Sequence, residues 1–96
     1  MQLARVTGTV VSTQKTENMR GMKLLIVEPV DVKTLESAGK PLVGVDAVGA
    51  GEDEIVLYVQ GSSARLTEQT EKLPVDCTII AIVDFVEVEG SRTFAK

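Results

Sequence analysis

Apolar and polar residues alternate along much of this chain, which is the pattern of half-buried β-strands. From Leu3 to Thr13 aliphatic residues occupy one face and polar residues the other, and this period of two predicts a first strand. Gly8 interrupts the pattern. A glycine inside a strand usually marks a bend or a close approach of another backbone, as at the corner of a barrel. We therefore expect a bent first strand.

Two other segments are apolar on both faces. They are Lys23 to Glu28 and Cys77 to Val83. Strands of this kind are covered on both sides, so we expect both in the interior of the fold and the second in its centre. Pro29 ends the earlier strand because it has no N–H to donate to a neighbouring strand.

A glycine-rich segment lies in the middle of the chain. Leu42 to Val48 and Glu54 to Val59 flank Gly49-Ala50-Gly51, and this order predicts two strands joined as a hairpin by a tight turn. Asp46 falls between apolar neighbours, where a carboxylate is either solvated or paired. With almost no side chain at its tip, the turn can pack closely against a neighbour.

The remaining segments complete a small β fold. Ser63 is a suitable N-cap, and Ser63 to Lys72 is predicted as a short helix. Phe85 to Val88 and Arg92 to Phe94 alternate like a small hairpin. We expect an all-β fold with one short helix, a five-stranded barrel like that of oligonucleotide/oligosaccharide-binding (OB) proteins. Residues 1–96 should form one domain, with the barrel over about 1–84 and a tail over 85–96.

Composition restricts the partners. The 96 residues are 44% hydrophobic but only 3% aromatic, so the core must be aliphatic. A chain of this size buries only about two-thirds of its unfolded surface, and association with other copies would stabilise it. Its net charge of −4 disfavours nucleic acid and anionic membranes. No apolar run approaches the roughly 20 residues that span a bilayer, so we expect a cytoplasmic protein without nucleic-acid or membrane partners.

The chain offers little chemistry. It has no histidine, which excludes Ser-His-Asp and Cys-His arrangements. The single cysteine, Cys77, opens a predicted buried strand and should be inert. Consecutive carboxylates at Glu52 to Glu54 point in different directions and suit a solvated turn better than a metal site. Gly49-Ala50-Gly51 matches no Walker or dinucleotide fingerprint. We expect no catalytic residue, cofactor or metal, and no enzyme.

Six segments in order and spacing resemble the EutN/CcmL family of bacterial microcompartment vertex proteins. They are Leu3-Ala4-Arg5-Val6-Thr7-Gly8, Lys23-Leu24-Leu25, Val45-Asp46-Ala47-Val48-Gly49-Ala50-Gly51, Gly61-Ser62-Ser63-Ala64-Arg65, Pro74-Val75-Asp76 and Ile82-Val83-Asp84. The resemblance implies a structural homopentamer that closes the five-fold corners of a protein shell, beside hexameric and trimeric shell proteins. The opening from Ala4 to Lys15 looks closer to the catabolic compartments than to carboxysomes.

A ring of five copies needs a contact between two different patches, and small residues let backbones approach there. Our hypothesis places the glycine turn and the serine-rich segment at or near this contact or a central pore, with Arg65 pairing a carboxylate such as Asp46 or Asp76. The residues are Asp46, Gly49, Ala50, Gly51, Ser62, Ser63, Ala64, Arg65 and Asp76. The simpler alternative is an intrachain turn and a helix cap, with Arg65 on the surface. The alternative function is an OB-fold module that binds single-stranded nucleic acid or a small ligand.

Overall fold

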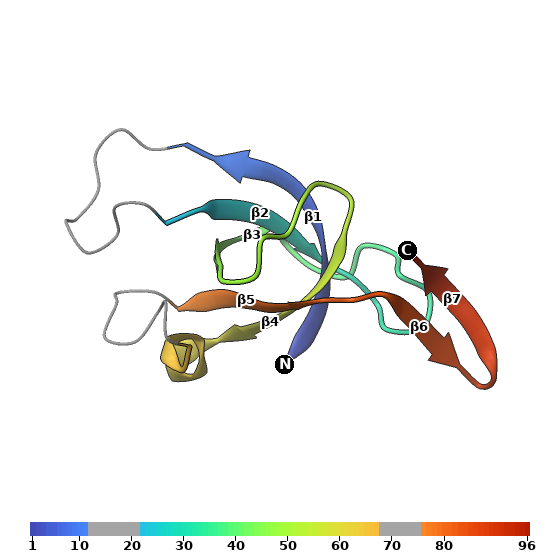
Figure 1. The fold of residues 1–96 in the computed structure, drawn as a ribbon. Coiled ribbons are helices and arrows are strands. Elements are labelled where there is room, and N and C mark those ends of the chain that lie inside the picture. Colours follow the sequence, from blue (N-terminus) through green and yellow to red (C-terminus); the bar gives the residue numbers. More distant parts are fainter. Residues whose placement is uncertain (12–21, 68–75) are drawn as a thin grey trace.

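The computed structural model describes residues 1–11, 22–67 and 76–96 (Figure 1). Five strands close a barrel in the order β1-β2-β3-β5-β4, and two more form a separate sheet. This arrangement confirms the expected small β-barrel. The elements are β1 (Gln2–Val10), β2 (Leu24–Pro29), β3 (Leu42–Asp46), β4 (Ile55–Gln60), the 3-10 helix η2 (Gly61–Arg65), β5 (Cys77–Ile82), β6 (Phe85–Val88) and β7 (Ser91–Ala95).

The bend expected in the first strand is present at Gly8. The pairing of β1 with β2 shifts register between Val6 and Gly8. A Cβ on Gly8 would lie 3.3 Å from the Ile26 side chain, so the two strands come close at this point. A bulge of this kind increases strand curvature, which a five-stranded barrel requires to close.

The central hairpin predicted from the sequence is wrong. β3 and β4 are not neighbours, because β5 lies between them, parallel to β3 and antiparallel to β4 (Figure 1). Residues 47–54 therefore form a loop that carries the chain past the position of β5. The alternation of apolar residues sets which face of a strand is buried but does not specify the partner along its edge. β5 is paired on both edges, as its apolar character predicted.

Among the described residues, the barrel interior is aliphatic apart from Tyr58 and Cys77. The buried cluster consists of Ala4, Val6, Leu25, Val27, Ala50, Val56, Tyr58, Cys77 and Ile79. Cys77 is the first residue of β5 and is 5% exposed, which confirms its predicted burial. Loss of water around the thiol raises its pKa to about 11, with a smaller effect from the charge of Asp76. The thiol is therefore protonated and unreactive at neutral pH.

The short helix and the tail follow the barrel strands. η2 begins at Gly61 rather than at the predicted Ser63, and the Gly61 N–H donates to the Asp76 carbonyl at 2.8 Å. η2 ends at Arg65, so the prediction of a helix through Leu66 and Thr67 is wrong, and its remaining part, residues 68–72, lies outside the described residues. β6 and β7 pair as an antiparallel hairpin that projects beyond the barrel (Figure 1). No helix in the described parts of the chain is long and apolar enough to cross a membrane.

Candidate functional site

The loop of residues 47–54 enters one end of the barrel. Ala50 is fully buried and belongs to the core cluster. Two backbone hydrogen bonds of 2.9 Å, Asp53 N–H to the Val6 carbonyl and Val6 N–H to the Glu54 carbonyl, tie the end of the loop to β1. Gly49 has a φ of 81°, a conformation that strains any residue with a side chain. The loop is thus a built part of the barrel.

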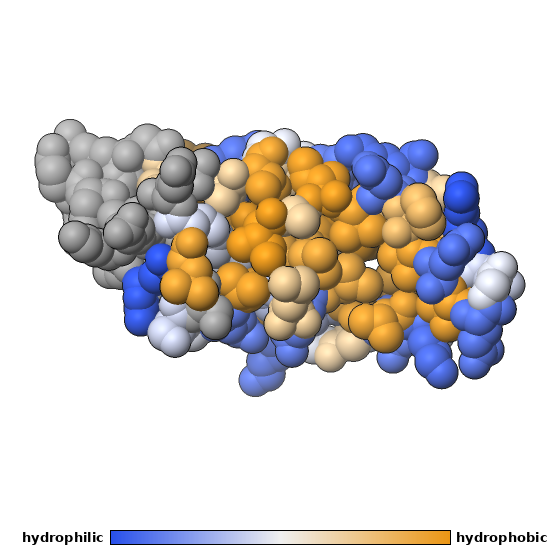
Figure 2. All heavy atoms as spheres, turned by 60° about the horizontal axis from the view of Figure 1, so that its bottom comes forward, coloured by the Kyte–Doolittle hydropathy of each residue, from blue (hydrophilic) through white to orange (hydrophobic). Residues whose placement is uncertain are grey.

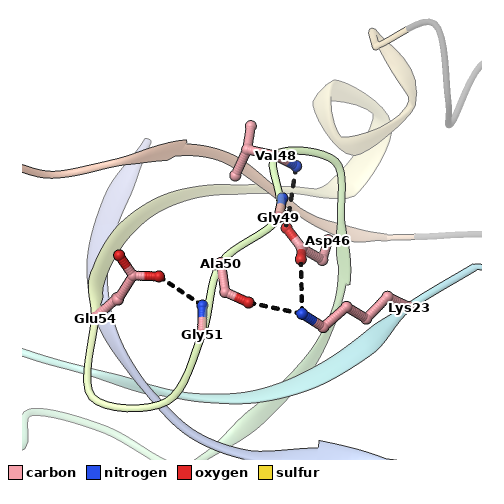
Figure 3. A network of polar contacts seen from close by, with 7 residues as sticks. All are labelled: Lys23, Asp46, Val48, Gly49, Ala50, Gly51 and Glu54. Atoms are coloured by element: carbon pink, nitrogen blue, oxygen red, sulfur yellow. Dashed lines mark hydrogen bonds and ion pairs between the residues drawn. The ribbon is translucent and has the colours of Figure 1, made fainter.

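Asp46 and Lys23 hold the first half of the loop (Figure 3). Asp46 Oδ1 accepts the N–H groups of Val48 at 3.0 Å and Gly49 at 2.9 Å, as an aspartate before a turn commonly does. Lys23 Nζ donates to the Ala50 carbonyl at 2.8 Å. The ammonium also lies 3.6 Å from Asp46 Oδ2, an ion pair too long for a hydrogen bond. Because the Asp46 side chain is 1% exposed, this carboxylate serves its own chain.

Glu54 holds the second half of the loop of residues 47–54. Its Oε1 accepts the Gly51 N–H at 2.6 Å (Figure 3), and its Oε2 lies 2.7 Å from Lys96 Nζ at the end of the hairpin. The Lys96 contact and then the Gly51 N–H lower the pKa of this carboxyl, so Glu54 remains charged at neutral pH. Among the described residues, no group of three carboxylate or cysteine side chains is placed to hold a metal ion.

The serine-rich segment forms η2, at the end of β4. Ala64 is fully buried, and its carbonyl accepts a hydrogen bond from the Thr78 hydroxyl of β5. Ser62, Arg65 and Asp76 are exposed, whereas Ser63 lies within the helix. Ala50 and Ala64, the small residues expected to meet another copy, therefore face the interior of their own chain. A contact of Arg65 with a carboxylate of another copy stays a prediction.

Lys23 and Glu54 were absent from the predicted site. The spacing of Gly51 and Glu54, three residues apart, is a weak signal for a side chain that caps a turn. Lys23 gave no signal, because its contact with Ala50 spans 27 positions in the sequence.

A second feature is a groove on the outside of the barrel, whose lining residues in the described part of the chain are uncharged. Met1, Val59, Leu66, Thr67 and Ile80 line it, and its volume is about 460 Å³. It lies on the outer surface of β4 and β5, next to the end of η2. Figure 2 shows the side of the molecule on which β4 and the N-terminus lie, with apolar residues in orange across its middle.

Comparison with known proteins assigns the family. The model described as "Ethanolamine utilisation protein EutN/carboxysome" (EutN_CcmL) matches residues 1–84. The chain belongs to the EutN/CcmL family. The match ends at Asp84, immediately before β6, so the β6–β7 hairpin lies outside the part that defines the family.

Curated relatives of this family match the full chain. The carboxysome shell vertex protein CcmL of Gloeobacter violaceus is 45% identical over 100% of this chain and 95% of its own length. The bacterial microcompartment shell vertex protein EutN of Salmonella typhimurium is 43% identical over 100% of this chain and 96% of its own. Both relatives are named as shell vertex proteins.

Solved structures of family members share the fold. The structure of Gloeobacter violaceus CcmL superimposes with a TM-score of 0.93 at 43% identity, covering 100% of this chain and 98% of that one. The structure of GrpN from Rhodospirillum rubrum, described as a pentameric microcompartment shell protein, gives a TM-score of 0.79 at 45% identity. It covers 92% of this chain and 98% of that one.

Proposed function

We propose that this chain is a structural protein that forms a homopentamer and closes the five-fold vertices of a bacterial microcompartment shell. The observation that carries the proposal is the similarity to the pentameric shell protein GrpN over 92% of this chain, together with full-length similarity to the vertex proteins CcmL and EutN. The protein works in the cytoplasm as part of the shell, beside the hexameric and trimeric proteins that tile its faces.

The geometry supports a role without catalysis. The chain has no histidine, and its single thiol is buried with a raised pKa. The carboxylates of Asp46 and Glu54 are engaged in holding the loop of residues 47–54. Both carboxylates therefore serve the structure of the chain.

Within this function, we propose a catabolic compartment. The support is the opening from Ala4 to Lys15, which resembles the catabolic type. Identity does not separate the two classes, because CcmL and EutN match at 45% and 43%. Co-expression of this chain with the tiles of each class tests the assignment. Catabolic tiles should form closed shells that contain it, and its incorporation into carboxysome shells alone would contradict the assignment.

The vertex role is tested by assembling shells with and without this chain. Shells made with it should be closed polyhedra in electron micrographs and should retain a small encapsulated fluorescent protein. Shells made without it should leak that cargo, since five-fold gaps remain at the corners. If shells without this chain are equally closed and equally tight, the vertex function is wrong.

The alternative of a nucleic-acid-binding module has little support from the site. Base stacking needs accessible aromatic rings over a basic groove. Tyr58 is 1% exposed and its hydroxyl donates to Gln2 at 2.6 Å, so it belongs to the core. Filter binding of oligonucleotides at low salt should show no retention. Tight binding would favour the module over the shell protein.

A further inference from the structure

An open cavity of about 520 Å³ lies at the end of the barrel where β1 and β3 begin and where β2 and β4 end. Leu3 and Leu42 line it from the starts of β1 and β3, Pro29 from the end of β2 and Gln60 from the end of β4. The loop of residues 47–54 follows the other end of β3, so it takes no part in this cavity. A cavity of this size can enclose a small molecule.

One wall of the cavity is the loop between β2 and β3, residues 30–41, which hydrogen bonds hold in place. The Val30 N–H donates to a carbonyl of β1 at 3.1 Å, and the Ala38 N–H donates to the last carbonyl of β2 at 2.8 Å. Within the loop, the Asp31 carboxylate accepts two backbone N–H groups. The cavity is therefore preformed, and a ligand does not have to order this wall when it binds.

Much of the lining is apolar and open to water. Leu3, Val30 and Leu42 form part of the wall. Met1 and Val32 also line the cavity, although their side chains are 79% and 57% exposed. A ligand with an aliphatic body would cover this surface and remove it from water, which is favourable in proportion to the apolar area that is covered.

The same cavity presents a few polar groups. They belong to Gln2, Lys40, Tyr58 and Gln60. The Tyr58 hydroxyl donates to the Gln2 amide oxygen at 2.6 Å, and burial raises the pKa of Tyr58, so this hydroxyl stays protonated at neutral pH. Because the amide oxygen of Gln2 is engaged, the NH₂ group is what this side chain offers to a ligand. Gln2 and Lys40 therefore supply hydrogen-bond donors.

The charge of the lining selects an anion. Lys40 is the one charged side chain that lines the cavity in the described part of the chain, although the whole sequence has 14 acidic and 10 basic residues. The Asp31 carboxylate is bonded to its own loop and is not among the lining groups. A cationic ligand would be repelled by the Lys40 ammonium. One ammonium with amide donors suits a single carboxylate better than a doubly charged phosphate, which usually takes several cationic or backbone donors.

We propose that this cavity binds a small organic acid, with its carboxylate at the donors of Lys40 and Gln2 and its aliphatic body over Leu3 and Val32. This binding is additional to the shell role and does not depend on the ring, because all the lining groups belong to one chain.

The test titrates the purified full chain with hexanoate, a monocarboxylate with an aliphatic body, while sodium chloride holds the ionic strength constant. Nuclear magnetic resonance follows the side-chain amide signals of Gln2 and Gln60 in isotope-labelled protein. Both signals should shift saturably, with a dissociation constant on the order of 1–10 mM. Hexanol and hexylammonium have the same chain length without the negative charge, and each should bind at least about fivefold more weakly.

A pair of variants tests the role of the positive charge. Lys40→Gln should weaken hexanoate binding by about fivefold or more and should change hexanol binding little. Lys33→Gln is the matched control, because it removes the same charge from an exposed position of the same loop that does not line the cavity. It should leave hexanoate binding unchanged.

A second pair tests the location of the site. Val32→Glu places a carboxylate at the border of the cavity and should weaken hexanoate binding by about fivefold or more. Val11→Glu adds the same charge at an 87% exposed position just past the far end of β1 and should leave the binding unchanged. Positions 11, 32, 33 and 40 are all exposed, so each variant should keep the wild-type far-ultraviolet spectrum.

The outcomes separate this inference from the proposed function. The absence of saturable shifts at Gln2 and Gln60 up to about 50 mM hexanoate would overturn the inference, whatever the mass of the assembly. Equal binding of hexanol and hexanoate, or equal losses in Lys40→Gln and Lys33→Gln, would overturn it as well. If the protein is a single chain at every concentration but binds hexanoate as described, the proposed ring fails and this inference stands.

Discussion

At the scale of residues, the loop of residues 47–54 is held by three charged side chains at or near its two ends. Asp46 and Lys23 fix its first half, and Glu54 fixes its second half. The sequence predicted that the Asp46 carboxylate is solvated or paired, and the structure shows it paired. Its partner could not be predicted, because Lys23 approaches only after β2 and β3 have paired. Contacts between distant residues depend on the closed barrel.

Asp46→Ala should destabilise the fold by about 1–3 kcal/mol, because it leaves the Val48 and Gly49 N–H groups without their acceptor. Asp46→Asn keeps an oxygen acceptor and should cost less. Urea unfolding at one fixed protein concentration measures both. Asp76→Ala removes an exposed side chain and should stay within about 0.5 kcal/mol of wild type. Equal stability of Asp46→Ala and wild type would contradict the role of this carboxylate.

The raised pKa of Cys77 predicts a loss of stability in alkaline solution. The thiol titrates at about 11 in the folded protein, against an ordinary value of 9.0, because burial disfavours the thiolate. The folded chain therefore holds this proton more tightly than the unfolded chain does. The stabilisation is complete below pH 9 and is lost as the pH rises toward about 11.

The prediction is tested by measuring the free energy of unfolding of wild type and Cys77→Ala across this pH range. Above pH 9 the free energy of unfolding should fall less steeply in the variant than in wild type. Burial, the main cause of the raised pKa of Tyr58, is present in both proteins, whereas the smaller effect of the Cys77 charge on Tyr58 is lost in the variant, so the difference reports the thiol together with its effect on Tyr58. Identical slopes would show that Cys77 does not titrate as proposed.

At the scale of elements, periodicity predicted the strands better than their partners. The bulge at Gly8, the position of β5 between two other strands and the hairpin of β6 and β7 appear where the pattern placed them, although only the first half of β5 is buried. The pairing of β3 with β4 does not occur. Two apolar segments separated by a short glycine-rich loop normally form a hairpin. Here β5, which begins at Cys77 and comes later in the chain than both, lies between them. The pairing partners of β3 and β4 depend on closure of the whole barrel, and no local sequence pattern specifies it.

Removal of residues 85–96 should leave the barrel folded. The core cluster contains no residue of the β6–β7 hairpin, and the hairpin's substantial element contacts are internal. The truncated chain should keep its far-ultraviolet spectrum, and its thermal midpoint should change little. Lys96→Met in the full chain is the control that isolates the lost contact with Glu54. An unfolded truncated chain, beside a folded Lys96→Met variant, would show that the hairpin is part of the folding unit.

At the scale of the whole molecule, the sequence indicated a small chain that gains stability from association, and the resemblance to vertex proteins supplied the geometry of that association. The single chain is compatible with a ring, because the aliphatic residues Val59, Leu66 and Ile80 line a groove on the outside of the barrel. Small residues alone do not locate the contact, because Ala50 and Ala64 are fully buried within a single chain. Packing inside a chain and packing between chains select the same small residue types.

Native mass spectrometry of the purified full-length chain tests the central claim, that copies of this barrel close into a five-membered ring. The account predicts a dominant species of five times the 10.3 kDa chain, retained on moderate dilution. A protein that stays a single chain, or a ring of any other number, would contradict it.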